Sequence, residues 1–322
     1  MRPKLLICTP IKDIKNLYQK LKKYFILSYR PNDKENKLKN LSQFDYIFTN
    51  PNMSKIKFNQ QFLVKCKKLK AICTASTGTN HIDLKYIKKK KIKLVSLRSK
   101  GKIIKKISST SELSFALMMN ALRNVNRASQ SIYKKKWEYL PYVGRQLNYM
   151  TVGVIGYGRL GKIFVNFLKP FNCKILIYEK NFKLRNKNKN YQSSLNKLLI
   201  NSDIIALHIH ADQENINFVN AKKLNKMKKN VIIINTSRGE IVSESDLIKF
   251  LRKNKNSKYA TDVVSNEISN KWNSKIIKEY FKKKNNIIIT PHIGGMTKEA
   301  QMLAYNAAVD DLISLHKKLN YK

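Results

Sequence analysis

The sequence predicts an α/β protein with two doubly wound domains, each built on a parallel β-sheet. Two series of short apolar runs alternate with helix-like segments, and strands that alternate with helices form parallel sheets with right-handed crossovers. A glycine-rich turn stands near the start of the second series, directly after an apolar run. The length of 322 residues is too great for one typical core and suits two domains.

The first series contains five apolar runs that we expect to be strands, and the second contains six. A long helix is predicted over 110–129, where Glu112 favours the dipole of the first turn. A final helix is predicted over 297–318, and the less regular segment 130–149 joins the long helix to the second series. The expected strands are 4–8, 24–28, 45–49, 69–76 and 92–96, followed by 150–156, 174–179, 203–209, 230–235, 258–263 and 286–290.

The net charge of +45 suggests nucleic acid or an anionic membrane surface as a partner. Most of the 65 basic residues are lysines, however, and they are spread along the whole chain beside periodic apolar segments. No basic stretch interleaves with aromatic residues as a base-stacking surface would. We therefore attribute the charge to compositional bias and do not favour nucleic acid as a partner, although a positive field would still steer an acidic small substrate.

The apolar pattern gives no membrane or export signal. No stretch approaches the roughly 18 apolar residues that span a bilayer, and the N-terminal run lacks the roughly 7–15-residue apolar segment of a signal peptide. We therefore predict a cytoplasmic protein without a membrane partner. The cysteines are scattered without a CxxC pair, so we expect buried reduced thiols and no metal site. They are Cys8, Cys66, Cys73 and Cys173.

The second series opens with a dinucleotide-binding motif, Gly156-x-Gly158-x-x-Gly161, placed between an expected strand and an expected helix. The first glycine permits a tight turn, the second lets a pyrophosphate approach the backbone, and the third lets helix and strand pack closely. The N-terminus of the helix supplies unsatisfied N–H groups to the phosphates. The motif therefore predicts a Rossmann domain.

The next expected strand ends at Glu179, 18 residues after Gly161. An acid at this place bonds the adenosine ribose hydroxyls and would repel a 2′-phosphate, which favours NAD over NADP. Lys180 and Lys183 lie nearby and weaken that preference.

Chemically active side chains follow three consecutive expected strands of the second series. Arg238 stands just past the buried run 231–234, Asp262 and Glu267 follow the next run, and His292 follows the last. Ligands of open parallel sheets bind beyond the carboxyl ends of the strands, so we expect these side chains to line one cleft. An arginine binds a carboxylate bidentately, and a histidine changes charge near neutral pH and can move a proton.

Motifs in seven segments carry a resemblance to a known family. The segments are 76–84, 108–119, 153–162, 203–220, 227–247, 260–267 and 290–300. In their order and spacing they resemble the D-isomer-specific 2-hydroxyacid dehydrogenase family, which includes phosphoglycerate, glycerate and hydroxypyruvate reductase-like members. The similarity runs through nearly the whole chain.

The resemblance implies an oxidoreductase that transfers hydride between NAD(H) and a small D-2-hydroxy acid or 2-keto acid. In this family pattern Arg238 binds the substrate carboxylate and carbonyl, His292 is the general acid/base, and Glu267 hydrogen-bonds His292. Asp262 holds the nicotinamide carboxamide. The implied cofactor-binding residues are Gly156, Gly158, Arg159, Leu160, Gly161, Glu179, His208, Thr236, Asp262 and Gly294, and the implied substrate-binding residues are Ser76, Thr77, Gly78, Thr79 and Arg238.

The resemblance also implies the domain organisation. A discontinuous, flavodoxin-like substrate-binding domain would comprise 1–103 and 296–322, and a Rossmann NAD-binding domain would comprise 104–295, with a cleft between them. Family members usually form homodimers through the cofactor domain, using the long helix near 110–129.

Several residues depart from the family pattern, and the roles of several others are not decided by the sequence. Ile268 follows Glu267 where a proline is common, which predicts a less rigid loop. We interpret His210 as structural and His316 as a surface residue, while His81 lies near the expected substrate loop and is a candidate substrate contact. Two roles are left open for four lysines: binding of a substrate phosphate or second carboxylate, or plain solvation at the surface. These lysines are Lys100, Lys102, Lys105 and Lys106.

Two alternative functions remain at this point. A catalytically silent dinucleotide-sensing scaffold would also retain Arg238, Glu267 and His292, and only a turnover assay separates it from an enzyme. A nucleic-acid-binding protein rests on charge alone and predicts steeply salt-dependent binding. The sequence does not identify the 2-hydroxy acid.

Overall fold

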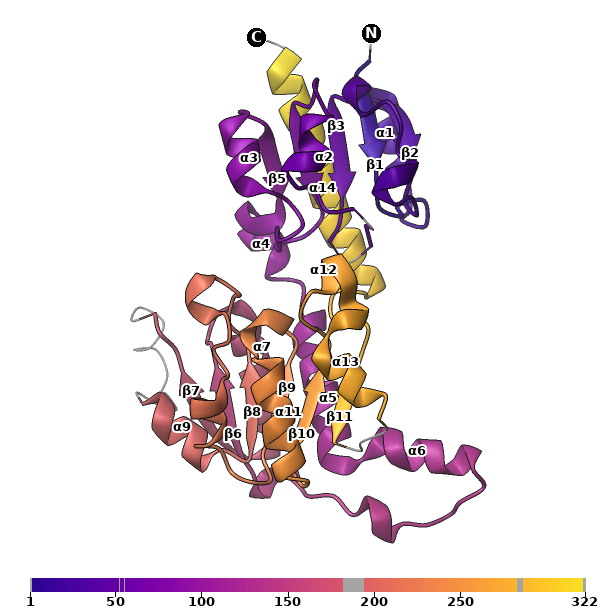
Figure 1. The fold of residues 1–322 in the computed structure, drawn as a ribbon. Helices are drawn as coiled ribbons and strands as arrows, with labels where there is room; N and C mark the ends of the chain where they lie inside the picture. Colours follow the sequence, from indigo (N-terminus) through magenta and orange to yellow (C-terminus); the bar gives the residue numbers. More distant parts are fainter. Residues whose placement is uncertain (1, 52, 55, 182–193, 283–285, 321–322) are drawn as a thin grey trace. The chain divides into compact units, whose positions relative to one another are not determined.

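The computed structural model forms two compact units (Figure 1). The N-terminal unit comprises 1–107 and 296–322, and the central unit comprises 108–295. The first boundary falls after Ile107, beyond the expected residue 103, because Ile103, Ile104 and Ile107 pack against the core of the N-terminal unit. The described residues are 2–51, 53, 54, 56–181, 194–282 and 286–320.

A five-stranded parallel sheet with the order β2-β1-β3-β4-β5 forms the middle of the N-terminal unit. Its strands are β1 Lys4–Ile7, β2 Ile26–Tyr29, β3 Tyr46–Thr49, β4 Ala71–Thr74 and β5 Lys93–Ser96, and its helices are α1 Leu17–Tyr24, α2 Gln60–Val64, α3 Leu84–Lys89, α4 Gly101–Ile104 and α14 Lys298–Asn320. Successive strand residues point to opposite faces. Leu5 and Ile7 pack with α1 and α14, whereas Leu6 and Cys8 pack with α2 and α3. This strand order is the flavodoxin-like one.

The described part of the central unit contains a six-stranded parallel sheet in the order β11-β10-β9-β8-β6-β7. Its strands are β6 Thr151–Ile155, β7 Lys174–Tyr178, β8 Ile204–Leu207, β9 Ile232–Asn235, β10 Lys258–Thr261 and β11 Ile287–Ile289. Its helices are α5 Ser109–Arg123, α6 Val125–Tyr133, α7 Arg159–Leu168, α9 Leu195–Asn201, α10 Ala221–Leu224, α11 Glu244–Lys253, α12 Glu267–Asn270 and α13 Lys275–Tyr280. Helices α5 and α7 cover one face, and α9, α10, α11 and α13 cover the other. The chain moves outward in both directions from β6, which is the arrangement that creates a ligand site at the strand ends.

All eleven expected strands and the final helix are confirmed, with ends that shift by at most two residues. The single long helix expected over 110–129 is wrong, because Asn124 adopts a left-handed conformation with φ 56° and separates α5 from α6. Asparagine tolerates this conformation better than most residues. Lys258 stabilises the break, since its Nζ donates to the Ala121 carbonyl and to Asn124 Oδ1, both at 2.6 Å.

No helix within the described residues is long and apolar enough to cross a membrane. Cys8, Cys66 and Cys73 are buried free thiols, and burial raises the pKa of all three. The expectation of burial is wrong for Cys173, which is only half-buried because it lies directly before β7, an edge strand of the described sheet. Among the described residues no group of three His, Cys, Asp or Glu side chains is placed to hold a metal ion.

Candidate active site

The glycine-rich turn after β6 has the geometry of a dinucleotide-binding loop. Gly156 has a φ of +98°, and a Cβ there would lie 2.4 Å from the His208 carbonyl oxygen. A Cβ on Gly161 would lie 2.1 Å from the Gly156 carbonyl oxygen, so the first turn of α7 packs directly on the loop. A Cβ on Gly158, by contrast, would meet nothing within 4 Å among the described residues. The loop therefore leaves open space at the N-terminus of α7, where a pyrophosphate fits.

Glu179 lies directly after β7 and faces this loop. Its Oε2 accepts the Tyr157 N–H at 2.6 Å, and its Oε1 accepts the Asn181 N–H at 2.8 Å. Lys180 forms an ion pair with Glu214, which offsets the positive charge beside Glu179. Lys183, the other lysine expected nearby, lies outside the described residues.

The structure also describes four further residues that are expected to contact the cofactor. Burial lowers the pKa of His208 to about 4, so its ring is neutral at pH 7, and the ring packs on Phe164 with centroids 4.9 Å apart. The Leu160 carbonyl accepts a hydrogen bond from Ser111 Oγ at 2.9 Å. Burial lowers the pKa of Arg159, which lies at the start of α7. Thr236 is 5% exposed, and its hydroxyl has no hydrogen-bond partner in the described part of the chain. A buried hydroxyl without a partner is costly, which fits a position that a ligand completes.

Strands β9, β10 and β11 end in register at one edge of the central sheet. Asn235 pairs with Thr261, and Thr261 pairs with Ile289, so the three strands finish at the same level. The sequence prediction that these strand ends meet is confirmed. Arg238 and His292 each follow the end of their strand by three residues.

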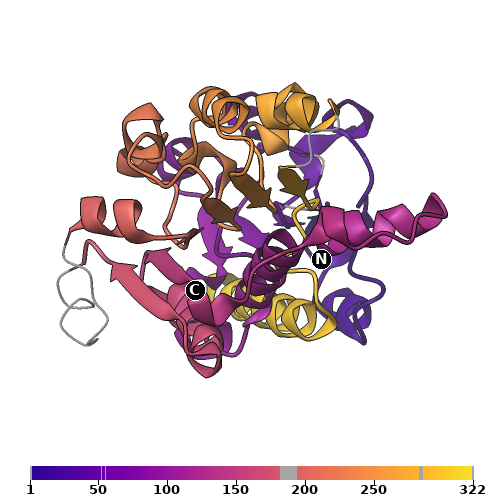
Figure 2. The same cartoon turned by 90° about the horizontal axis from the view of Figure 1, so that it is seen from below.

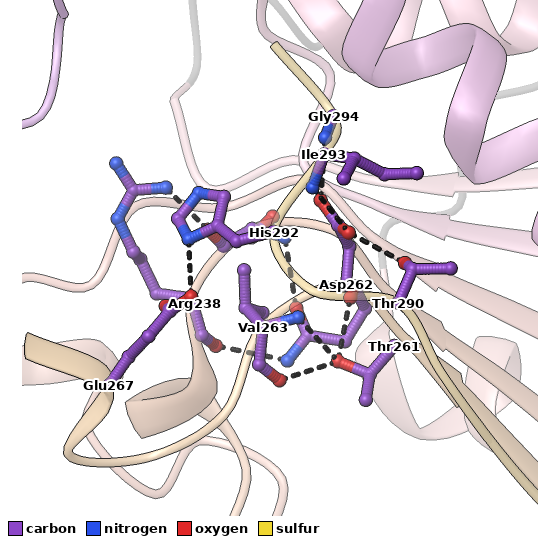
Figure 3. Close-up of polar contacts among 11 residues, drawn as sticks. Arg238, Thr261, Asp262, Val263, Glu267, Thr290, His292, Ile293 and Gly294 are labelled. Atoms are coloured by element: carbon purple, nitrogen blue, oxygen red, sulfur yellow. Dashed lines mark hydrogen bonds and ion pairs between the residues drawn. The ribbon is translucent and has the colours of Figure 1, made fainter. Parts of the chain in front are cut away.

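The structure brings His292 and Glu267 into contact (Figure 3). Nδ1 of His292 lies 2.7 Å from Oε1 of Glu267, and their side chains are 18% and 25% exposed. Because a carboxylate only accepts hydrogen bonds, this contact assigns a proton to Nδ1. The opposite ring nitrogen, Nε2, is then the atom that exchanges a proton with a ligand.

Asp262 holds the turn that carries His292 (Figure 3). It accepts Thr290 Oγ1 at 2.6 Å, the Ile293 N–H at 2.8 Å and the Gly294 N–H at 2.7 Å. Burial raises the pKa of this carboxyl, and the three hydrogen bonds oppose that rise. The turn needs such support because His292 has a positive φ of 57°, a conformation that costs free energy in residues other than glycine. No local pattern in the sequence indicates this structural role, because the donors are distant in the chain.

Arg238 stands on a turn that is fixed from both sides. Its Nη1 donates to the Ser237 carbonyl at 2.6 Å, its own carbonyl accepts Asn235 Nδ2 at 2.9 Å, and Ser237 Oγ donates to the Leu207 carbonyl at 2.7 Å. A Cβ on the next residue, Gly239, would lie 2.0 Å from the carbonyl carbon of Val264. The backbone on which the half-buried guanidinium stands is therefore well determined.

The expected substrate loop, Ser76–Thr79, follows β4 in the N-terminal unit. Ser76 Oγ donates to the Gly78 carbonyl at 2.6 Å, and Arg98 Nε donates to the Thr77 carbonyl at 3.0 Å. Among the hydrogen bonds of the described residues, none uses a backbone N–H of this loop as its donor. The loop carbonyls are thus engaged, while its N–H groups stay available to a ligand.

The structure changes the interpretation of two histidines, His81 and His316. His81, a candidate substrate contact, is 1% exposed and lies in the core, where its Nε2 is 3.3 Å from Thr74 Oγ1. His316, which was expected at the surface, is half-buried: its ring centroid lies 5.1 Å from that of Phe25, and burial lowers its pKa.

Two further positions lie at the protein surface. Lys100 forms a 2.7 Å ion pair with Asp311 of α14, which gives it a structural partner. His210 is exposed, and its carbonyl accepts Asn215 Nδ2 at 2.9 Å.

A Rossmann-type sheet with this glycine loop, and with a histidine–carboxylate pair at its strand ends, defines a dinucleotide-binding dehydrogenase. Residues 115–294 match the family model of the D-isomer specific 2-hydroxyacid dehydrogenase, NAD binding domain. The chain belongs to the D-isomer-specific 2-hydroxyacid dehydrogenase family. It is an NAD-dependent oxidoreductase that acts on the CH–OH group of 2-hydroxy acids.

Named relatives cover most of the chain. It is 31% identical over 288 residues to the hydroxypyruvate reductase of Blautia hydrogenotrophica, covering 87% of this chain and 84% of that protein. It is 30% identical over 269 residues to the D-3-phosphoglycerate dehydrogenase of Archaeoglobus fulgidus, covering 83% of this chain but only 49% of that protein. The crystal structure of D-lactate dehydrogenase from Aquifex aeolicus complexed with NAD and lactic acid matches with a TM-score of 0.79 and 28% identity, covering 98% of this chain and 95% of that one.

Proposed function

We propose that the protein interconverts a small D-2-hydroxy acid and its 2-keto acid, with Arg238 as the substrate carboxylate ligand and His292–Glu267 as the acid/base pair. The observation that carries this proposal is the 2.7 Å contact between His292 Nδ1 and Glu267 Oε1, at the strand ends of a dinucleotide-binding sheet. The half-buried Arg238 follows a strand of the same edge.

The chemistry needs a hydride and a proton to move together. NAD, when bound, supplies the site that accepts or donates the hydride. In keto-acid reduction, protonated His292 gives its Nε2 proton to the developing alkoxide, and Glu267 stabilises the imidazolium beforehand. In the reverse direction neutral His292 takes the hydroxyl proton. The guanidinium of Arg238 orients the carboxylate and polarises the carbonyl.

The N–H groups of Ser76–Thr79 are proposed as further donors to the substrate carboxylate. The proposal rests on their lack of a carbonyl acceptor among the described residues. Backbone N–H groups without acceptors are well suited to bind a carboxylate group.

The NAD-binding residues are proposed to be those of the loop and the strand ends. The loop residues from Gly156 to Gly161 would hold the pyrophosphate, Glu179 would bond the ribose hydroxyls, and the Thr236 hydroxyl would face the dinucleotide. The backbone of His208 would support the loop, since its carbonyl oxygen leaves no room for a Cβ on Gly156. For Asp262 and Gly294, the hydrogen bond that joins them at 2.7 Å favours a shared place near the nicotinamide.

We expect NADH to give a higher kcat/KM than NADPH, because the Glu179 carboxylate repels a 2′-phosphate. Glu179→Ala should lower the ratio of kcat/KM with NADH to kcat/KM with NADPH by about tenfold or more, since a hydrogen bond to a charged group contributes about 1.5–3 kcal/mol. The measurement is kcat/KM with each cofactor on both proteins. A wild-type preference for NADPH would contradict the prediction and point to Lys180 and Lys183.

A turnover assay tests the function itself. Purified protein is mixed with NADH or NADPH and with hydroxypyruvate, glyoxylate, pyruvate or a phosphorylated hydroxypyruvate, and nicotinamide absorbance is followed. NADH binding without turnover of any 2-keto acid would favour the dinucleotide-sensing scaffold. Tight, steeply salt-dependent binding to duplex or single-stranded DNA would favour the nucleic-acid alternative.

We also propose a homodimer, on the evidence of an exposed apolar stretch at 132–143 that begins in α6. Figures 1 and 2 show α6 extending away from the sheet of its own unit. The side chains are large and exposed, namely Ile132 51%, Tyr133 88%, Trp137 89%, Tyr139 78%, Leu140 74% and Val143 72%. A contiguous exposed patch of this kind marks an interaction site, and a second copy offers the same surface across a two-fold axis.

We expect a dimer in light scattering after size-exclusion chromatography, and a shift toward monomer for Trp137→Ser combined with Tyr139→Ser. Trp272→Ser is the control, because Trp272 is 61% exposed but lies outside the stretch. A monomeric wild-type protein at micromolar concentration would refute the dimer.

A further inference from the structure

Glu244, a carboxylate outside the expected site, binds both ends of the segment that carries Glu267. Its Oε1 accepts the Ser265 N–H at 3.0 Å and Ser274 Oγ at 2.8 Å. Its Oε2 accepts the Lys275 N–H at 2.7 Å and the Ile276 N–H at 3.3 Å. The side chain of Glu244 thus joins the two ends of the segment 265–276, which forms a loop. We call the joined ends, residue 265 and residues 274–276, the loop base.

The four contacts nearly exhaust the acceptor capacity of a carboxylate, which has about four lone-pair positions. Hydrogen bonds to a charged acceptor are roughly twice as strong as neutral ones. Glu244 is the first residue of α11, and it is half-buried. Its carboxylate is therefore committed to the loop base.

Two features of the backbone beside Glu267 make this support useful. Ile268 follows Glu267 where a proline would have fixed φ, and Asn266 before it has a positive φ of 59°. The loop base also packs on Gly239, where a Cβ would lie 2.3 Å from the Ser265 nitrogen. The segment that immediately follows Arg238 therefore places the loop from which Glu267 reaches His292.

We propose that Glu244 is a positioning residue that holds Glu267 against His292 and so sets the pH range over which the enzyme works. The proposal rests on the acid/base function proposed for His292–Glu267. It gives Glu244 no contact with substrate or cofactor. Its effect passes from the loop base at Ser265, through two residues of backbone, to the carboxylate of Glu267.

The test compares Glu244→Ala and Glu244→Gln with Asp246→Ala. Asp246 lies in the same first turn of α11, but its carboxylate accepts the Ala221 N–H at 3.0 Å, outside the loop. We expect Glu244→Ala to lower kcat about tenfold, a part of the roughly 100- to 10,000-fold that general acid–base catalysis contributes. The alkaline limb of the reduction profile should move to lower pH, less so for Glu244→Gln. NADH affinity and the profile of Asp246→Ala should match wild type.

A double variant distinguishes positioning from a general loss of stability. If Glu244 acts through Glu267, then adding Glu244→Ala to Glu267→Gln should move the pH limb no further, because coupled residues are not additive. A limb that moves in Glu267→Gln but not in Glu244→Ala overturns the positioning role and leaves the proposed function intact. A limb that does not move in Glu267→Gln refutes the acid/base assignment itself.

Two measurements keep the test decisive if Glu244→Ala does not fold. Ser274→Ala removes one of the four donors and should move the limb in the same direction by a smaller amount. The chain has five histidines, so NMR of the histidine-labelled protein can follow the titration of His292 without substrate. An unchanged His292 titration in folded Glu244→Gln and Ser274→Ala would overturn the proposal.

Discussion

Replacing Arg238 with alanine is expected to abolish most turnover while leaving NADH binding nearly unchanged. The guanidinium is half-buried on a turn fixed by Asn235, Ser237 and Gly239, and its proposed partner is the substrate rather than the nucleotide. Loss of a charged, desolvated contact costs about 2–5 kcal/mol of transition-state binding. That range corresponds to a fall in kcat/KM of about 30- to 5,000-fold.

Steady-state kinetics and NADH fluorescence titration check this prediction together. Arg238→Lys is the matched control, because lysine keeps the charge and loses the planar fork that binds a carboxylate through two bonds. We expect its kcat/KM to lie between those of wild type and Arg238→Ala. A fall of less than about tenfold in Arg238→Ala would show that Arg238 does not bind the substrate carboxylate.

Glu267→Gln is expected to shift the pH dependence of both reaction directions toward lower pH. The Glu267 carboxylate lies 2.7 Å from Nδ1 and stabilises the imidazolium form of His292. Reduction needs the imidazolium and is lost as pH rises, so weaker stabilisation moves its alkaline limb to lower pH. Oxidation needs the neutral ring and is gained as pH rises, so its acidic limb moves the same way.

The measurement is kcat/KM against pH in both directions for wild type and Glu267→Gln. Arg238 stays charged across this range and should contribute no limb. Asp246→Asn serves as the control for removal of a carboxylate from the same unit, because Asp246 bonds Ala221 and not His292. Limbs that stay in place, or that move to higher pH, would show that Glu267 gives His292 no electrostatic support.

Local patterns in the sequence were sufficient for the strands and for the residues that end them. Runs such as 231–234 are apolar throughout because both faces of their strand are covered, and this signal needs no knowledge of the fold. The role of Gly161 was also predictable, since it depends on a contact within the turn itself, whereas a Cβ on Gly156 would meet the carbonyl of His208, which follows the neighbouring strand β8. Because parallel strands end at the same edge of a sheet, chain order alone brought Arg238, Glu267 and His292 to one edge of the central unit.

The tertiary structure decided the features that depend on contacts between distant residues. Lys258 reaches back to Asn124 and stabilises the break between α5 and α6, and packing against Phe25 half-buries His316. Asp262 orders the turn of His292, and Glu244 orders the loop of Glu267, through hydrogen bonds to residues 21 to 32 positions away. A sequence pattern shows which side chains can accept hydrogen bonds. Only the folded backbone determines which donors come within 3 Å of them, and so which carboxylates hold the site in place.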